Sequence, residues 1–240
     1  WTVLFIFSLV ETKIIHYSSL CYFPLSFLAA EYLSETYNSK PKKWLTTIII
    51  SLGSLLILVF TVIPIFGFNI KRILNSGIIK DPFAEANLSA DVSWGIIDFS
   101  PAFFILFALI GFIFFQQSKR WYVFLTGSLI SFSLLSVIII PKIEMISQNA
   151  AIEFYKSKQN EDCYVDTYHF SSYADLFYTL KQPSNDKMHT NKGHLLIGAP
   201  DKPVYIVVKI HDREQFENEI PNFKFLYGKN GFLFYKRTDI

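Results

Sequence analysis

A lysine, a histidine and a tyrosine lie close together near the start of the chain, in the sequence ETKIIHY at residues 11–17. Lys13 offers a point charge that suits a phosphate, and His16 and Tyr17 add hydrogen-bonding groups. Apolar runs flank this stretch on both sides, so it lies where two membrane helices would meet the membrane surface. Ionisable residues at such a boundary are either interfacial anchors or part of a site. Residue types alone leave both readings open, an anchor at the membrane surface or an anion site.

Acidic residues form a second group of candidates in a later loop. Asp81 and Glu85 are spaced four residues apart, which would suit a metal ion or a segment that covers a site. The same spacing is typical of a solvated loop face, and that is the reading we adopt. We expect Asp91 and Asp98 to be solvated in the same way.

The remaining candidates are histidines and a cysteine. His169, His189 and His194 lack the spacing of zinc ligands, so we expect them at the surface or in turns. We expect Cys163 to be a small buried residue, because no His or Asp pattern marks it as a nucleophile. The sequence has no glycine-rich phosphate loop, so no nucleotide is expected as a cofactor.

Composition indicates a membrane protein with a soluble part. The chain has 240 residues, of which 51% are hydrophobic and 18% are charged, and its mean hydropathy is +0.31. Soluble domains carry roughly 25% charged residues. The net charge is +2, and no basic stripe with interleaved aromatic residues appears, so nucleic-acid binding is not expected.

The apolar runs predict a multi-span helical bundle over residues 1–142, followed by a soluble domain over residues 143–240. The clearest run covers residues 44–66, which give about 34 Å of helix, enough for a hydrocarbon core of roughly 30 Å. The predicted spans are 1–10 (partial), 17–34, 44–66, 99–116 and 121–140.

Basic residues predict the orientation of these spans. Loops 35–43 and 117–120 hold three and two basic residues, which places both on the cytoplasmic side. Trp44 and Trp121 follow these clusters as interfacial anchors would. Loop 67–98 and the C-terminal domain then lie outside the cell.

The C-terminal domain is predicted to be a small α/β fold, roughly βαββ with a leading helix. Asn230-Gly231 indicates a tight hairpin between its last two strands. Helices are expected over 143–158 and 171–181, with Ser171 or Ser172 as a cap, and strands over 163–168, 204–210, 223–227 and 232–237.

The run Thr12-Lys13-x-x-His16-Tyr17, followed by Pro24 in an apolar helix, resembles a motif of bacterial membrane glycosyltransferases. These are family 39 enzymes with the GT-C fold, which include protein O-mannosyltransferases and lipid A aminoarabinose transferases. The stretch CYVDTYHFSSYADLFY at 163–178 is similar to the periplasmic domain of the same family.

The resemblance implies a transferase that uses a polyprenyl-phosphate-linked sugar, with a lipid, glycan or protein as acceptor. It implies that Lys13 contacts the donor phosphate and that His16 and Tyr17 line the same site. It also implies a location in the plasma (inner) membrane, in contact with membrane lipids, with the C-terminal domain extracytoplasmic. The cofactor stays open, with a divalent metal as one option.

The same resemblance places the catalytic acidic residues in an early extracytoplasmic loop that these residues do not contain. The chain begins at Trp1 inside an apolar run, so we expect an upstream segment and an inactive fragment. The alternative is a non-enzymatic membrane-anchored binding module or a transporter fragment. A transporter should carry charged residues near mid-membrane, and the spans 44–66, 99–116 and 121–140 have none.

Overall fold

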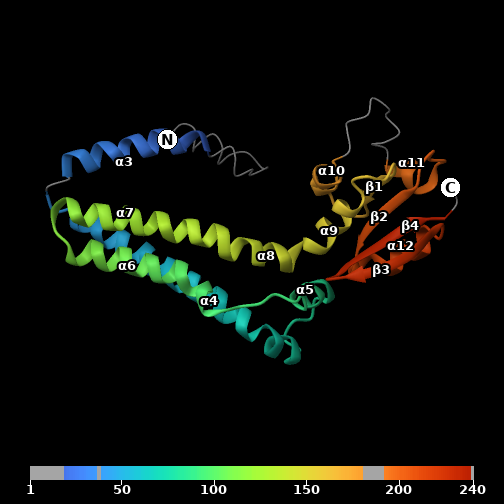
Figure 1. Ribbon diagram of the computed structural model, residues 1–240, viewed down its shortest axis with the longest axis horizontal. Helices are drawn as coiled ribbons and strands as arrows, with labels where there is room; N and C mark the ends of the chain where they lie inside the picture. The colour runs from blue at the N-terminus through green and yellow to red at the C-terminus, as the bar shows by residue number, and fades with distance from the viewer. Residues whose placement is uncertain (1–18, 37–38, 181–191, 239–240) are drawn as a thin grey trace. The chain divides into compact units, whose positions relative to one another are not determined.

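The computed structural model describes residues 19–36, 39–180 and 192–238 (Figure 1). The chain divides into two compact units. The first comprises Trp1–Thr61 and Phe99–Ser133, and the second comprises Val62–Asp98 and Leu134–Ile240. The second unit therefore joins the loop that follows the first long helix to the C-terminal domain.

The described residues of the apolar part are mainly helical, with non-helical connections such as 76–81 and 89–95. Three segments, Lys43–Asn75, Ile96–Phe114 and Ser118–Ser147, are long and apolar enough to cross a membrane. They coincide with the predicted spans 44–66, 99–116 and 121–140. The elements are η1 (Ser19–Cys21), α3 (Tyr22–Thr36), α4 (Lys43–Asn75), η2 (Ile96–Phe99), α6 (Ser100–Phe114), α7 (Gln117–Leu134), η3 (Leu135–Ile139) and α8 (Ile140–Ser147).

Two of the predicted spans are not described as full crossings. Span 1–10 lies outside the described residues. Span 17–34 overlaps η1 and α3, and its first residues lie outside the described residues, so it stays a prediction.

Helix α4 is longer than the predicted span. It runs for 33 residues and includes Pro64, so it extends over about 50 Å. The predicted loop 67–98 therefore begins with helix, because polar residues such as Asn69 and Lys71 end an apolar run without ending a helix.

The soluble domain was expected to begin shortly after the predicted span 121–140, but the helix continues past Pro141. A proline removes a backbone donor, and its ring clashes with the preceding turn. The π-helical turn η3 directly precedes it, with the Ile140 N–H donating to the carbonyl of Leu135, and such a wider turn accommodates the ring. The predicted helix 143–158 is therefore split between α8, which continues the apolar helix, and α9.

Small residues bring the helices of the first unit together. A Cβ on Gly53 would lie 3.0 Å from Leu109, and a Cβ on Gly127 would lie 2.7 Å from Ala108. The Ser131 hydroxyl donates to the Pro101 carbonyl at 2.7 Å. Trp121, predicted to be an interfacial anchor, is instead buried against Phe112, with ring centroids 5.3 Å apart.

The C-terminal part of the second unit is a mixed four-stranded sheet with the strand order β1-β2-β4-β3. The β1–β2 pair is parallel, and the other two pairs are antiparallel. The elements are α5 (Pro82–Leu88), α9 (Asn149–Ser157), β1 (Tyr164–Thr167), α10 (Ala174–Thr179), α11 (Lys192–Ile197), β2 (Val204–Lys209), η5 (Ile210–Asp212), α12 (Arg213–Glu219), β3 (Phe223–Lys229) and β4 (Phe232–Arg237).

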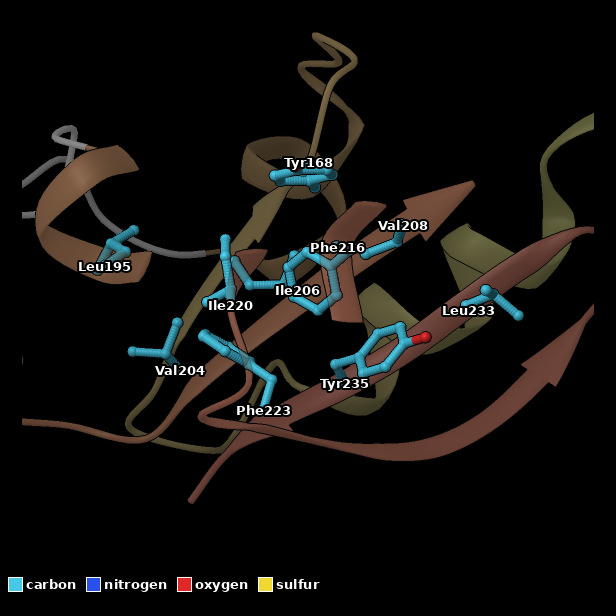
Figure 2. Packing of buried hydrophobic residues seen from close by; sticks show 10 residues of the cluster. All are labelled: Tyr168, Leu195, Val204, Ile206, Val208, Phe216, Ile220, Phe223, Leu233 and Tyr235. Carbon is cyan, nitrogen blue, oxygen red and sulfur yellow. The ribbon is translucent and has the colours of Figure 1, made fainter. Parts of the chain in front are cut away.

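Both faces of β2 are covered, which explains its continuous apolar run. Val204, Ile206 and Val208 point to one face, where they pack with residues of α11 and α12 (Figure 2). Tyr205 and Val207 point to the other face and pack against α9. Successive side chains of a strand alternate between faces, so a strand covered on both sides has no polar positions.

The predicted strands and the hairpin are confirmed. Asn230 and Gly231 have φ values of 48° and 78°, the conformation of a type I′ turn. The predicted cap was wrong: the helix begins later than expected, at Ala174, and its N-cap is Tyr173, without a side-chain cap bond. Ser172 accepts from the Ala174 N–H at 3.1 Å from outside the cap position. Helices α11 and α12 were not predicted, because α12 is held by a single buried apolar side chain, Phe216, and shows no apolar periodicity.

Candidate functional site

The residues singled out first, Lys13, His16 and Tyr17, lie outside the described residues. Three polar features of the second unit are described instead, and each involves the loop between α4 and α6. They are an ion pair at the end of the loop, the contacts of helix α5, and a cleft beside that helix.

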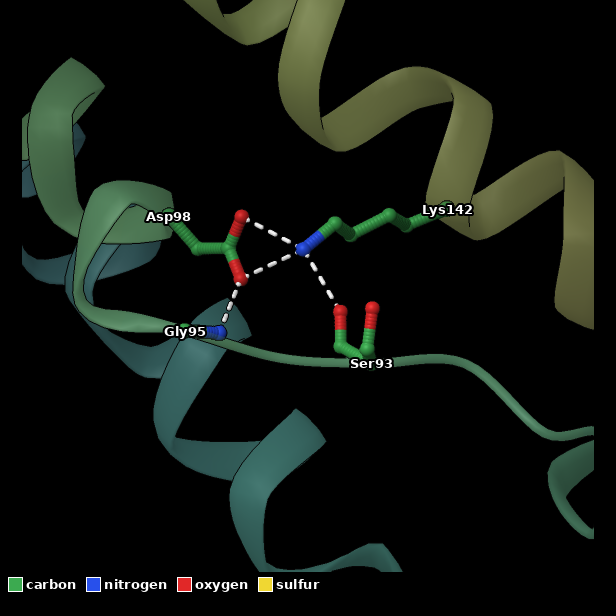
Figure 3. A network of polar contacts seen from close by, with 4 residues as sticks. All are labelled: Ser93, Gly95, Asp98 and Lys142. Atoms are coloured by element: carbon green, nitrogen blue, oxygen red, sulfur yellow. Dashed lines mark hydrogen bonds and ion pairs between the residues drawn. The ribbon is translucent and has the colours of Figure 1, made fainter.

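The ion pair joins Asp98 to Lys142 (Figure 3). The Lys142 ammonium donates to both carboxylate oxygens at 2.7 and 2.6 Å and to the Ser93 carbonyl at 2.7 Å. The Gly95 N–H donates to the same carboxylate at 2.7 Å. The prediction that Asp98 is solvated was wrong, because its side chain is only 1% exposed. A buried carboxylate needs such partners, since an unpaired buried charge is costly.

Trp94 completes this arrangement. The Lys142 ammonium lies 5.1 Å from the centre of the Trp94 ring, within the range of a cation–π interaction. The other contact of the ring is with α4 at Gly67, where an added Cβ would lie 2.2 Å from the indole. Trp94 therefore connects the loop to α4, and the Asp98–Lys142 ion pair connects it to α8.

Helix α5 packs on the sheet. Asp81 caps it by accepting from the N–H groups of Phe83 and Ala84, and it is also hydrogen-bonded to His211 at 2.8 Å. The Ala84 N–H, followed by His211, lowers the pKa of the Asp81 carboxyl. The Phe83 ring meets Phe232 edge to face at 5.2 Å. Asp81 is exposed, as predicted for this loop, but it acts as a helix cap.

A cleft of about 230 Å³ lies beside α5. Its apolar wall includes Phe83, Ile152, Phe170 and Phe232, and its polar groups include Gln148, Ser171 and Lys209. No Asp or Glu is among its lining residues. Proteins bind drug-sized ligands in pockets of roughly 300–1,000 Å³, so this cleft suits a smaller group.

Lys209 is the charged group of the cleft. It ends β2 and is half-buried, and its ammonium lies 5.2 Å from the Phe83 ring centre and 4.9 Å from that of Phe170. In the described part of the chain it has no hydrogen bond or salt bridge. Its ammonium therefore makes cation–π contacts with two rings and forms no ion pair with a described carboxylate.

Two buried polar groups lie near the cleft. The hydroxyl of Tyr155, which lines it, and one carboxylate oxygen of Asp175 on the adjacent α10 have no hydrogen-bond partner among the described residues. Burial, with smaller contributions from the charges of Asp175 and Asp166, raises the pKa of the Tyr155 hydroxyl. Burial also raises the pKa of the Asp175 carboxyl. Tyr155 is therefore a neutral hydroxyl at physiological pH.

The other predicted residues show no catalytic arrangement in the described ranges. Cys163 is buried, as expected. His169 stacks on Tyr168 and lies 3.6 Å from an oxygen of Asp212, and Glu85 is exposed on α5. Within residues 19–36, 39–180 and 192–238, no group of three or more His, Cys, Asp and Glu side chains is placed to hold a metal ion.

Sequence reasoning missed Lys209 and the Asp98–Lys142 pair. Lys209 was read as part of a strand, although a lysine that ends a run of buried apolar residues is a recognisable signal. Asp98 directly precedes the predicted span 99–116, and Lys142 follows the span 121–140. The predicted topology places both residues on the same side of the membrane, so their opposite charges could have suggested a pair.

Comparisons with known proteins found no relative of this chain. No family model, no curated protein and no solved structure matches the chain.

Proposed function

We propose that this chain is the C-terminal part of an integral-membrane glycosyltransferase. It would move a sugar from a polyprenyl-phosphate donor to an extracytoplasmic lipid, glycan or protein acceptor. The observation that carries the proposal is the sequence Thr12-Lys13-x-x-His16-Tyr17 between apolar runs. Lys13 would contact the donor phosphate, and His16 and Tyr17 would line the same site.

The described residues support the proposal at a coarser level. Three helices are long and apolar enough to cross a membrane, and a small mixed sheet follows them. Helix α5, in the loop between two of these helices, packs on the sheet through Phe83 and His211. This contact favours a topology in which loop 67–98 and the sheet domain share one side of the membrane, and the basic residues of the other loops would make this the extracytoplasmic side.

The test is sugar transfer by the complete natural protein in membranes. Lys13→Ala should lower the release of polyprenyl phosphate from a labelled polyprenyl-phosphate hexose or pentose by at least a hundredfold. Lys80→Ala is the matched control, because Lys80 is an exposed loop lysine and its loss should change the rate less than twofold. Activity of Lys13→Ala within a few-fold of the natural protein would refute the assigned role.

The second candidate is a non-enzymatic, membrane-anchored binding module. The observation that favours it is the cleft beside α5, which is formed by residues of the second unit. Under this reading Lys13→Ala would leave the cellular function intact, whereas filling the cleft would abolish it. Complementation of a deletion strain with each variant distinguishes the two readings.

A further inference from the structure

The charge of the cleft beside α5 points to the kind of group that it would accept. Lys209 brings one positive charge to its wall, and none of the lining residues is acidic. The half-buried Lys209 ammonium lies near two aromatic rings, and a negatively charged ligand would supply a counter-charge. The cleft therefore favours an anion.

Further hydrogen-bond donors lie at the rim. The Gln148 amide and the Ser171 hydroxyl are exposed lining residues, and within the described residues neither side chain has a partner. Both are able to donate to an oxygen-rich anion. Together with Lys209 they bring donors from α8–α9, from the segment before α10 and from β2 to one volume of about 230 Å³.

The place of the cleft in the chain indicates where such an anion would come from. Ser147, at the end of the third membrane-length segment, is one of its lining residues. The end of a span marks the level at which hydrocarbon gives way to the polar head groups. The cleft is therefore close in the chain to the end of a membrane-length helix, and a lipid phosphate would be available there.

An exposed apolar stripe next to the cleft supports a lipid source. Tyr173, Leu176, Phe177 and Leu180 are 86%, 59%, 71% and 66% exposed. Leu176 and Phe177 lie on α10, and Tyr173 and Leu180 directly precede and follow it, so the four exposed apolar side chains are close together in the chain, shortly after the rim residue Ser171. Exposed apolar side chains of this kind are typical of segments that lie in the membrane interface.

We propose that the cleft binds the phosphate-bearing head group of a membrane lipid, with the Lys209 ammonium as the anion contact and the α10 stripe in the surrounding interface. Its volume suits a phosphate with a short attached group. This binding site uses none of the residues proposed around Lys13, and it would operate in an enzyme or in a binding module.

The experiment is a native mass-spectrometry titration of the full chain in detergent, with dihexanoyl phosphatidic acid as the probe. Lys209→Met removes the charge and keeps an apolar stem between the rings, and it should weaken binding at least tenfold. Lys224→Met is the matched control, since this exposed lysine lies on β3 of the same sheet, and its effect should stay within twofold. Ser171→Trp, at an exposed rim position, should also weaken binding by narrowing the mouth.

Two further arms identify the source of the phosphate. Dihexanoyl glycerol, which lacks phosphate, should not bind, and inorganic phosphate should compete at least tenfold more weakly than the lipid. After reconstitution, Phe177→Trp should add fluorescence that brominated lipids quench. The proposal is overturned if Lys209→Met binds within twofold of the natural chain, if Lys224→Met loses as much, if inorganic phosphate binds as tightly as the lipid, or if the new tryptophan is not quenched.

Discussion

Replacing Lys142 by methionine tests the ion pair that closes the loop between α4 and α6. The change leaves Asp98, 1% exposed, with the Gly95 N–H at 2.7 Å as its remaining hydrogen-bond partner among the described residues. Leaving one member of a buried pair uncompensated costs about 3–5 kcal/mol. Asp98→Asn should cost less, about 1–3 kcal/mol, because the Lys142 side chain is 20% exposed and still donates to the Ser93 carbonyl.

Hydrogen exchange of the backbone amides in residues 91–98 measures this cost locally. A local measurement is needed because a chain with two units has no single two-state unfolding free energy. A loss of about 3–5 kcal/mol corresponds to exchange faster by roughly two to four orders of magnitude, since each 1.4 kcal/mol is about tenfold. The double variant should lose less than the sum of the single variants, because the two side chains act as one pair.

Lys80→Met is the control, since Lys80 is an exposed loop lysine and its removal should leave exchange unchanged. The reasoning would be refuted if exchange in Lys142→Met stayed within threefold of that in the natural chain. It would equally be refuted if the effects of Asp98→Asn and Lys142→Met simply added.

Four other substitutions each test a single position. Gly67→Ala should displace Trp94 and shift its fluorescence, since the new Cβ would lie 2.2 Å from the indole; an unchanged spectrum contradicts this. Gly77→Ala should lower the stability by only about 1 kcal/mol, the strain of a side chain at positive φ, because nothing lies within 4 Å of the added Cβ. Gly231→Ala should cost about 1 kcal/mol more, because its Cβ would lie 2.8 Å from the Phe83 ring; equal thermal midpoints contradict this. Burial raises the pKa of Asp175 above 3.8, so the native state binds this proton more tightly and stability falls as pH rises through that pKa. Asp175→Asn should therefore flatten the dependence of the thermal midpoint on pH, and an unchanged slope would exclude this carboxyl as its source.

The predictions that succeeded rest on local signals. The apolar runs 44–66, 99–116 and 121–140 are long enough to reveal helices by themselves, and Asn230-Gly231 specifies its turn because both residues adopt positive φ readily. The predicted ends of these helices were less accurate. Polar residues mark where an apolar run ends, but α4 continues through Asn69, and the last apolar helix continues past Pro141 by means of a π-helical turn.

The sequence by itself determined the apolar helices, the strands of the small sheet and the local turn between β3 and β4. It also raised Lys13, His16 and Tyr17 as candidates, and they remain a prediction. Only the tertiary structure decided that Asp98 is buried against Lys142 and that Lys209 lies between two aromatic rings in a cleft. The physical reason is distance along the chain: Asp98 and Lys142 are 44 positions apart, and Lys209 meets rings from α5 and from the segment after β1. Whether a charged side chain is solvated or paired depends on which distant segment packs against it, and no local pattern records that.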